Sequence, residues 1–148
     1  MPLATTHFFF PYLLCDAYQK YLKKKKIFFL SIIAGLAGTA PDLDFILTII
    51  YDNISLHRLY THNYLVAVGF LIVAGFFYFA KKRNLAAIFT IISFGWASHV
   101  FLDNLITPYN LTKFQYGYLD AVVLFAWICW ELYNRKSEFR RFLITTIK

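Results

Sequence analysis

Long apolar stretches, separated by short polar or basic segments, constrain this chain more than any other feature. The clearest stretch, residues 64–80, has seventeen residues without a charged side chain, which is near the lower limit for a helix that crosses a bilayer. Over the whole chain 59% of residues are hydrophobic and 16% are charged, whereas about a quarter are charged in soluble domains. The pattern therefore predicts an all-α integral membrane bundle.

Five helical segments are predicted, at residues 5–22, 27–50, 64–80, 85–106 and 118–133. The second is expected to break at Pro41, because proline disfavours the α region for Ala40 and suits the first turn of a new helix. Small residues before the break, Gly35 and Gly38 among them, predict close contact with neighbouring helices. A loop at 107–116 and a basic tail at about 134–148 complete a single domain of residues 1–148.

The basic residues predict an orientation. If the five segments cross, thirteen of the fifteen Lys and Arg residues lie on one side, and only Arg58 and Lys113 lie on the other. The positive-inside rule then predicts a multi-pass protein of the cell (inner) membrane, with the N-terminus extracytoplasmic and the C-terminus in the cytoplasm. The net charge of +7 is accordingly interpreted as an orientation signal and as contact with membrane lipid. No nucleic-acid partner is expected.

His99 and Asp103 are four residues apart in an otherwise apolar segment. On a helix these residues share one face, and ionisable side chains within an apolar span indicate a functional site. A buried His–Asp pair that satisfies itself is the alternative. At 1.5 Å per residue, five further residues fall at the same depth near the outer face. They are His7, Asp42, Asp44, His57 and His62.

Four imidazoles and three carboxylates at one depth suit Zn²⁺ or a similar first-row ion, with one or two ions bound. The predicted metal ligands are His7, Asp44, His62, His99 and Asp103. From each of the pairs 42/44 and 57/62 one ligand is expected, because helical spacing turns the two side chains in different directions. Asp42 and His57 are therefore close candidates as ligands.

The predicted catalytic residues are Asp42, His57 and Arg58. Asp42 is the preferred general base, and the guanidinium of Arg58 suits a phosphate or carboxylate substrate. Thr61 is expected to cap the helix that follows it. Asp16, Asp120 and Glu131 are expected to be structural.

Several linked motifs occur along the chain: Thr6-His7, Pro41-Asp42-Leu43-Asp44, His57-Arg58 with Thr61-His62, and Ser98-His99 with Asp103 and Thr107-Pro108. In order and spacing they resemble the membrane-bound metal-dependent hydrolases of the YdjM type. Leu59 and Asn63 depart from the glycine and serine usual in that family. More distantly, residues 99–108 resemble the His-x-x-x-Asp helix of zinc-dependent phospholipase C and related single-strand nucleases.

The distant resemblance implies that Asp103 bridges two metals, with His7 serving one and with Asp44, His62 and His99 serving the other. No histidine follows His99, so a third metal is not expected. The sequence as a whole predicts a metal-dependent hydrolase of phosphoesters, in a lipid-linked or interfacial substrate, near the extracytoplasmic face.

Two alternatives stay open. An ion or small-molecule transporter would need polar residues toward the cytoplasmic side, where residues 27–36 and 85–93 offer almost none. A non-catalytic metal-stabilised scaffold would use the same residues as an enzyme, because closed and open metal sites draw on the same ligand types.

Overall fold

The computed structural model describes residues 4–21, 28–44, 46, 50–51, 61–106 and 113–146. Within these ranges the chain forms α-helices and one 3₁₀-helix, η1, and no strand, so the all-α prediction is confirmed. The elements are α1 (Ala4–Tyr21), α2 (Phe28–Thr39), η1 (Ala40–Asp44), α4 (Tyr64–Phe79), α5 (Arg83–Ile106) and α6 (Lys113–Thr146).

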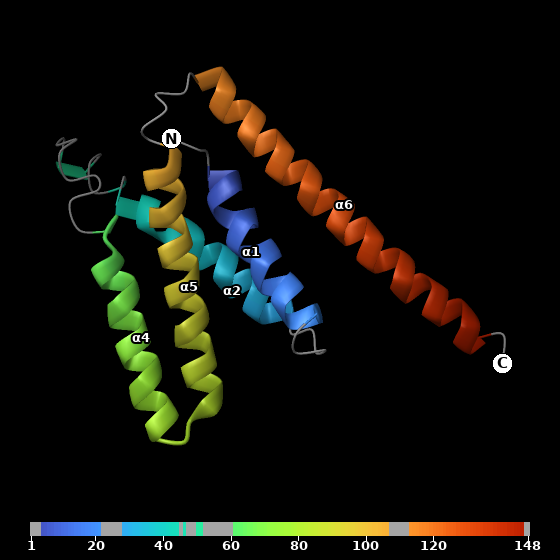
Figure 1. Cartoon of the computed structure of the whole chain (residues 1–148), viewed down its shortest axis with the longest axis horizontal. Helices are drawn as coiled ribbons and strands as arrows, with labels where there is room; N and C mark the ends of the chain where they lie inside the picture. The colour runs from blue at the N-terminus through green and yellow to red at the C-terminus, as the bar shows by residue number, and fades with distance from the viewer. Residues whose placement is uncertain are drawn as a thin grey trace.

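The helices pack in an order that places α2 centrally (Figure 1). α2 contacts both α1 and α5, α4 packs against α5, and α6 packs against α1. α4 and α5 form an antiparallel hairpin, whereas α1 and α6 run in the same direction (Figure 1). Elements from both halves of the sequence therefore meet around the first turn of α1 and the end of α2.

The predicted break in the second segment is confirmed. α2 ends at Thr39, whose hydroxyl donates to the Leu36 carbonyl at 3.0 Å, and a 3₁₀-helix containing Pro41 follows. The predicted last segment was too short, because α6 begins at Lys113 inside the expected loop and continues to Thr146 through the expected tail. No proline follows Pro108, so the sequence contains no strong helix breaker there.

Small residues let the backbones of α1, α2 and α5 approach closely, as predicted for α2. A Cβ added at Gly38 would lie 2.2 Å from the backbone oxygen of His7. One added at Gly95 of α5 would lie 2.4 Å from the backbone oxygen of Ala34. Only glycine fits these two crossings, and both crossings flank the candidate site.

Polar groups lie inside this bundle and large apolar groups lie outside. His99 and Asp16 are fully buried, whereas Phe79 is 84% exposed. Among the described residues one helix, Arg83–Leu105, is long and apolar enough to cross a membrane, and Tyr64–Phe79 is a shorter apolar helix.

Candidate metal centre

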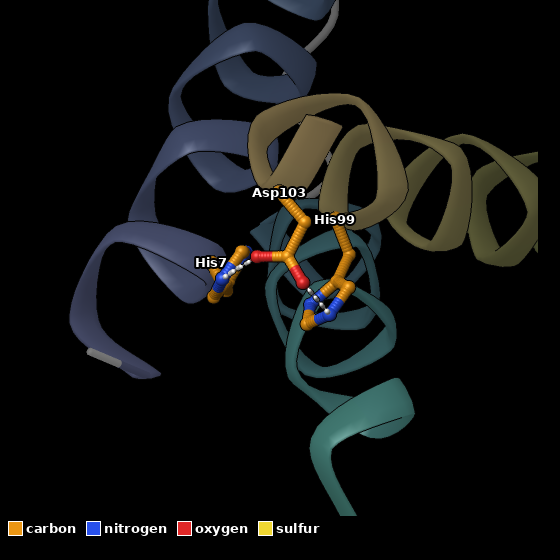
Figure 2. A group of neighbouring side chains, drawn as sticks. All are labelled: His7, His99 and Asp103. Atoms are coloured by element: carbon orange, nitrogen blue, oxygen red, sulfur yellow. Dashed lines mark ion pairs between the residues drawn. The ribbon is translucent and has the colours of Figure 1, made fainter. Parts of the chain in front are cut away.

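Six of the predicted site residues converge where α1, η1, α4 and α5 meet. The first turn of α1 supplies one histidine, η1 supplies two carboxylates, the residue before the α4 cap supplies a second histidine, and one turn of α5 supplies a histidine and a carboxylate. In that order they are His7, Asp42 and Asp44, His62, and His99 and Asp103. Figure 2 shows His7 approaching His99 and Asp103 from the opposite helix.

The His99 ring is held in one orientation. Its Nδ1 lies 2.8 Å from the backbone oxygen of Gly38. A carbonyl oxygen only accepts, so Nδ1 carries the hydrogen and Nε2 of the neutral ring presents a lone pair. That lone pair faces Nε2 of His62 at 3.0 Å. A backbone carbonyl on the far ring nitrogen is the usual support for a metal-ligating histidine.

Two carboxylates meet the same pair of nitrogens. Asp42 Oδ1 lies 3.5 Å from His62 Nε2 and 3.6 Å from His99 Nε2. Asp103 Oδ2 lies 3.4 Å and 3.8 Å from the same two atoms. A tetrahedral ion with bonds of 2.0–2.1 Å separates its ligand atoms by about 3.3–3.4 Å. The spacing of these atoms is close to that of metal ligands, and Asp42, His62 and His99 could hold an ion.

His7 adds a second group around the other oxygen of Asp103. Its Nε2 lies 3.4 Å from Asp103 Oδ1, and its ring stacks on His99 with centroids 3.9 Å apart. In the described part of the chain its buried Nδ1 has no hydrogen-bond partner. His7, His99 and Asp103 are also close enough to hold an ion. Asp103 thus faces His7 with one oxygen and His99 with the other (Figure 2). The second oxygen also faces His62.

Asp44 lies on the other side of the His62 ring. Its Oδ2 is 3.7 Å from His62 Nδ1 and accepts a hydrogen bond from the Thr61 hydroxyl, which itself lies 3.0 Å from that nitrogen. The Trp96 indole N–H donates to the Thr61 carbonyl at 2.8 Å. The structure therefore brings Asp42, rather than Asp44, to the converging ring nitrogens.

The expectation that Thr61 caps α4 was wrong. Asn63 is the cap, because its side chain accepts from the backbone N–H of Leu65 at 2.9 Å, two residues closer to the helix. This frees the Thr61 hydroxyl to support His62. The supporting residues Thr61 and Trp96 were missed as site residues, since neither carries a metal-ligating group.

Two predicted catalytic residues, His57 and Arg58, lie outside the described residues. Their roles stay predictions from the sequence.

Residues 1–115 match the family described as YdjM inner membrane protein. The chain belongs to this family. The YdjM match spans α1 to α5 and therefore every residue of the metal centre, whereas α6 lies almost wholly beyond it. The family's description as inner membrane proteins agrees with the apolar exterior of the bundle. Neither a search of curated proteins nor a search of solved structures found a match.

Proposed function

We propose that this protein is a membrane-embedded, metal-dependent hydrolase whose centre uses His62, His99 and Asp103 as ligands. The observation that carries the proposal is the convergence of two imidazole nitrogens and two carboxylate oxygens at 3.0–3.8 Å. They come from three separate segments and meet in the interior of the bundle. Nitrogen and oxygen ligands at this spacing suit Zn²⁺.

The differing exposure of the carboxylates divides their roles. The side chains of His62, His99 and Asp103 are at most 8% exposed, whereas that of Asp42 is 32% exposed. Catalytic zinc sites keep three protein ligands and one open position. Asp42 is the most exposed of the four, and with Zn²⁺ bound it would be placed to accept the proton of the attacking water.

A bound Zn²⁺ supplies an activated water and polarises a phosphoryl oxygen. The chain holds the surrounding groups in place: Gly38 orients the His99 ring, and Asp44 with Thr61 orients the His62 ring. Asp44 thereby takes a supporting role in place of the ligand role expected from the sequence. His57 and Arg58 keep their predicted catalytic roles.

A second ion has a candidate position of its own. His7 Nε2 and Asp103 Oδ1 lie 3.4 Å apart, and a carboxylate whose two oxygens face different histidines is suited to bridging two ions. Measuring the number of zinc ions bound per chain would show whether this second position is occupied.

An apolar groove supports a lipid-linked substrate. It has a volume of about 580 Å³ and lies between α1, α2 and α6, with Phe8, Ile32, Leu36 and Trp127 in its lining. Phe8, which lines the groove, directly follows His7 in the sequence, so the groove begins on the same turn of α1 as one residue of the metal centre. A phosphoester that carries a hydrocarbon chain could place its chain there and its phosphate at the centre.

The distribution of side chains supports a multi-pass arrangement with the centre near the extracytoplasmic face. Large apolar side chains cover the outside of the bundle, as Leu65, Ile72 and Phe125 show with exposed fractions of 67–72%. In water such a surface is unfavourable, but lipid satisfies it. The basic residues 81–83 join α4 to α5 at the end of the hairpin opposite His62, about 24 Å away along sixteen helical residues. That separation fits a cytoplasmic basic turn and an outer metal centre.

A transporter is the second candidate, because polar side chains continue along α1 away from the centre. Tyr12 donates to Glu131 at 2.9 Å, and Asp16 accepts from Trp130 at 2.7 Å. These groups hydrogen-bond one another across α1 and α6, which favours a role in holding the two helices together.

Hydrolysis assays on the purified protein in detergent test the proposal. Phosphomonoesters and phosphodiesters with short and long acyl chains are supplied to chelator-treated and zinc-restored protein. Hydrolysis is expected only with zinc. Asp42→Asn should keep the metal but lose 10²–10⁴-fold in rate, His99→Ala should lose both, and Cys129→Ser, on an exposed face of α6, should lose neither.

The alternatives give different results. If the wild type retains zinc but hydrolyses no substrate in the panel, and Arg58→Ala behaves in the same way, a scaffold would be favoured. Zinc-dependent ion flux in liposomes without hydrolysis would favour a transporter.

A further inference from the structure

We infer that Asp120 of α6 is a positioning residue for the metal centre, because it fixes the start of α1 and with it His7. The inference rests on the metal centre proposed above. Asp120 Oδ1 accepts the backbone N–H of Thr6 at 3.0 Å and also accepts the Thr6 hydroxyl. Thr6 and Asp120 are 1% and 6% exposed, so water does not compete for these bonds. The next residue is His7.

The first turn of α1 needs an acceptor from elsewhere. The first four N–H groups of an α-helix have no partner within the helix, and Thr6 is the third residue of α1. A residue just before the helix usually supplies the acceptor. Here a carboxylate 114 positions away supplies it, and its negative charge is also favourable at a helix N-terminus. Breaking the bond would leave a buried N–H unpaired, which is costly in an apolar interior.

The position of His7 depends on that first turn. Its ring contacts Asp103 through Nε2 and stacks on His99, but its Nδ1 has no hydrogen-bond partner in the described part of the chain. Because Nδ1 makes no hydrogen bond there, the His7 ring should move with the backbone of α1 if that backbone shifts. Such a shift would act on the centre through Asp103, whose second oxygen faces His62 and His99.

This dependence makes α6 part of the site. The family match ends at residue 115, and Asp120 lies beyond it. The metal centre is thus completed by a helix that contributes no metal ligand.

A matched control lies on the same two helices. Tyr12 donates to Glu131 at 2.9 Å, six residues along α1 from Thr6. Glu131→Ala removes a carboxylate that joins α6 to α1, as Asp120→Ala does, but it leaves the first turn of α1 intact. Tyr12→Phe is likewise the control for Thr6→Val, since each removes one hydroxyl.

The experiment uses the full-length protein in detergent and two measurements. In the metal-free protein, diethyl pyrocarbonate modification of His7 is followed by peptide mass spectrometry. Asp120→Ala should speed the modification about tenfold, a factor within the range that the loss of the two buried hydrogen bonds to Thr6 allows. Zinc affinity, from competition with a chelator, should fall 10–100-fold, as it does when a support of a metal ligand is removed. Glu131→Ala should leave both values near those of the wild type.

The outcomes separate the two claims. Equal effects of Asp120→Ala and Glu131→Ala, or no effect of either, would overturn the positioning role. If Asp120→Ala fails to fold, Thr6→Val removes the hydroxyl bond to Asp120 and keeps the N–H bond, so it should show the same changes at a smaller size, and Tyr12→Phe should show none. Asp120→Asn, whose amide oxygen still accepts the Thr6 N–H, should stay near the wild type, and Thr6→Val behaving like Tyr12→Phe would overturn the positioning role. A wild type that binds no zinc would refute the proposed function, whereas the modification of His7 would still test Asp120.

Discussion

Replacing Gly95 with alanine should separate α5 from α2 and move His99 away from the Gly38 carbonyl that orients its ring. An added Cβ would lie 2.4 Å from the Ala34 backbone oxygen and 2.7 Å from the Ala37 Cβ. Ordinary contacts of a Cβ begin at 3.4 Å, so the helices must part by about 1 Å. His99 lies one turn beyond Gly95, and its Nδ1 is 2.8 Å from the Gly38 oxygen. That hydrogen bond would lengthen beyond its useful range.

The energetic cost follows from three terms. Overpacking costs about 1–3 kcal/mol, and the lost hydrogen bond costs about 0.5–1.5 kcal/mol. Alanine in place of glycine within a helix returns about 0.5–1 kcal/mol. The net loss of stability should be about 0.5–4 kcal/mol. Zinc affinity should fall at the same time, because the orientation of His99 is no longer fixed.

Gly75→Ala on α4 is the control, since an added Cβ there meets nothing within 4 Å. It should be neutral or stabilising by up to about 1 kcal/mol. Equilibrium unfolding in detergent and zinc competition would measure both variants. If Gly95→Ala matched Gly75→Ala in stability and in zinc affinity, the account of the α2–α5 crossing would be refuted.

Three further variants test separate parts of the structure. Thr61→Val removes the hydroxyl beside His62 Nδ1 and should weaken zinc binding about tenfold in chelator competition; unchanged affinity would contradict the supporting role. Trp130→Phe removes the indole donor to the buried Asp16 and should lower the free energy of unfolding by about 1–3 kcal/mol without changing zinc affinity, so a parallel loss of zinc would count against a purely structural role. Ile32→Trp fills the groove and should raise KM for long-chain phosphoesters only; an equal rise for short-chain substrates would rule out the groove as the chain-binding site.

The gathering of the site residues could be predicted from the sequence. Helical rise and the placement of basic residues put His7, His62 and His99 at one depth with Asp42 and Asp103, and the structure brings these five together. Such a prediction needs only segment boundaries and 1.5 Å per residue. It is robust because an error of two residues moves a side chain by about 3 Å.

The choice between Asp42 and Asp44 could not be predicted in the same way. Their relative direction was worked out for an α-helix, but residues 40–44 form a 3₁₀-helix, which turns by 120° per residue instead of 100°. The sequence marks a break at Pro41, and it does not specify which helix type follows. The contact of Asp44 with Thr61 and His62 depends on that local geometry.

The role of α6 could not be predicted from the sequence either. Asp120 was expected to be structural, but its partner Thr6 lies 114 positions away, and no periodicity links the two. Their contact follows from the parallel packing of α6 on α1 (Figure 1), which is decided by helix packing rather than by local pattern.

The metal content of the purified protein tests the central claim most directly. Elemental analysis of the wild type after dialysis against zinc and then buffer should give one or two zinc ions per chain. His99→Ala and Asp103→Ala should lose that zinc, and Cys129→Ser should keep it. A folded wild type without stoichiometric zinc, or a His99→Ala variant that retains as much zinc as the wild type, would contradict the account.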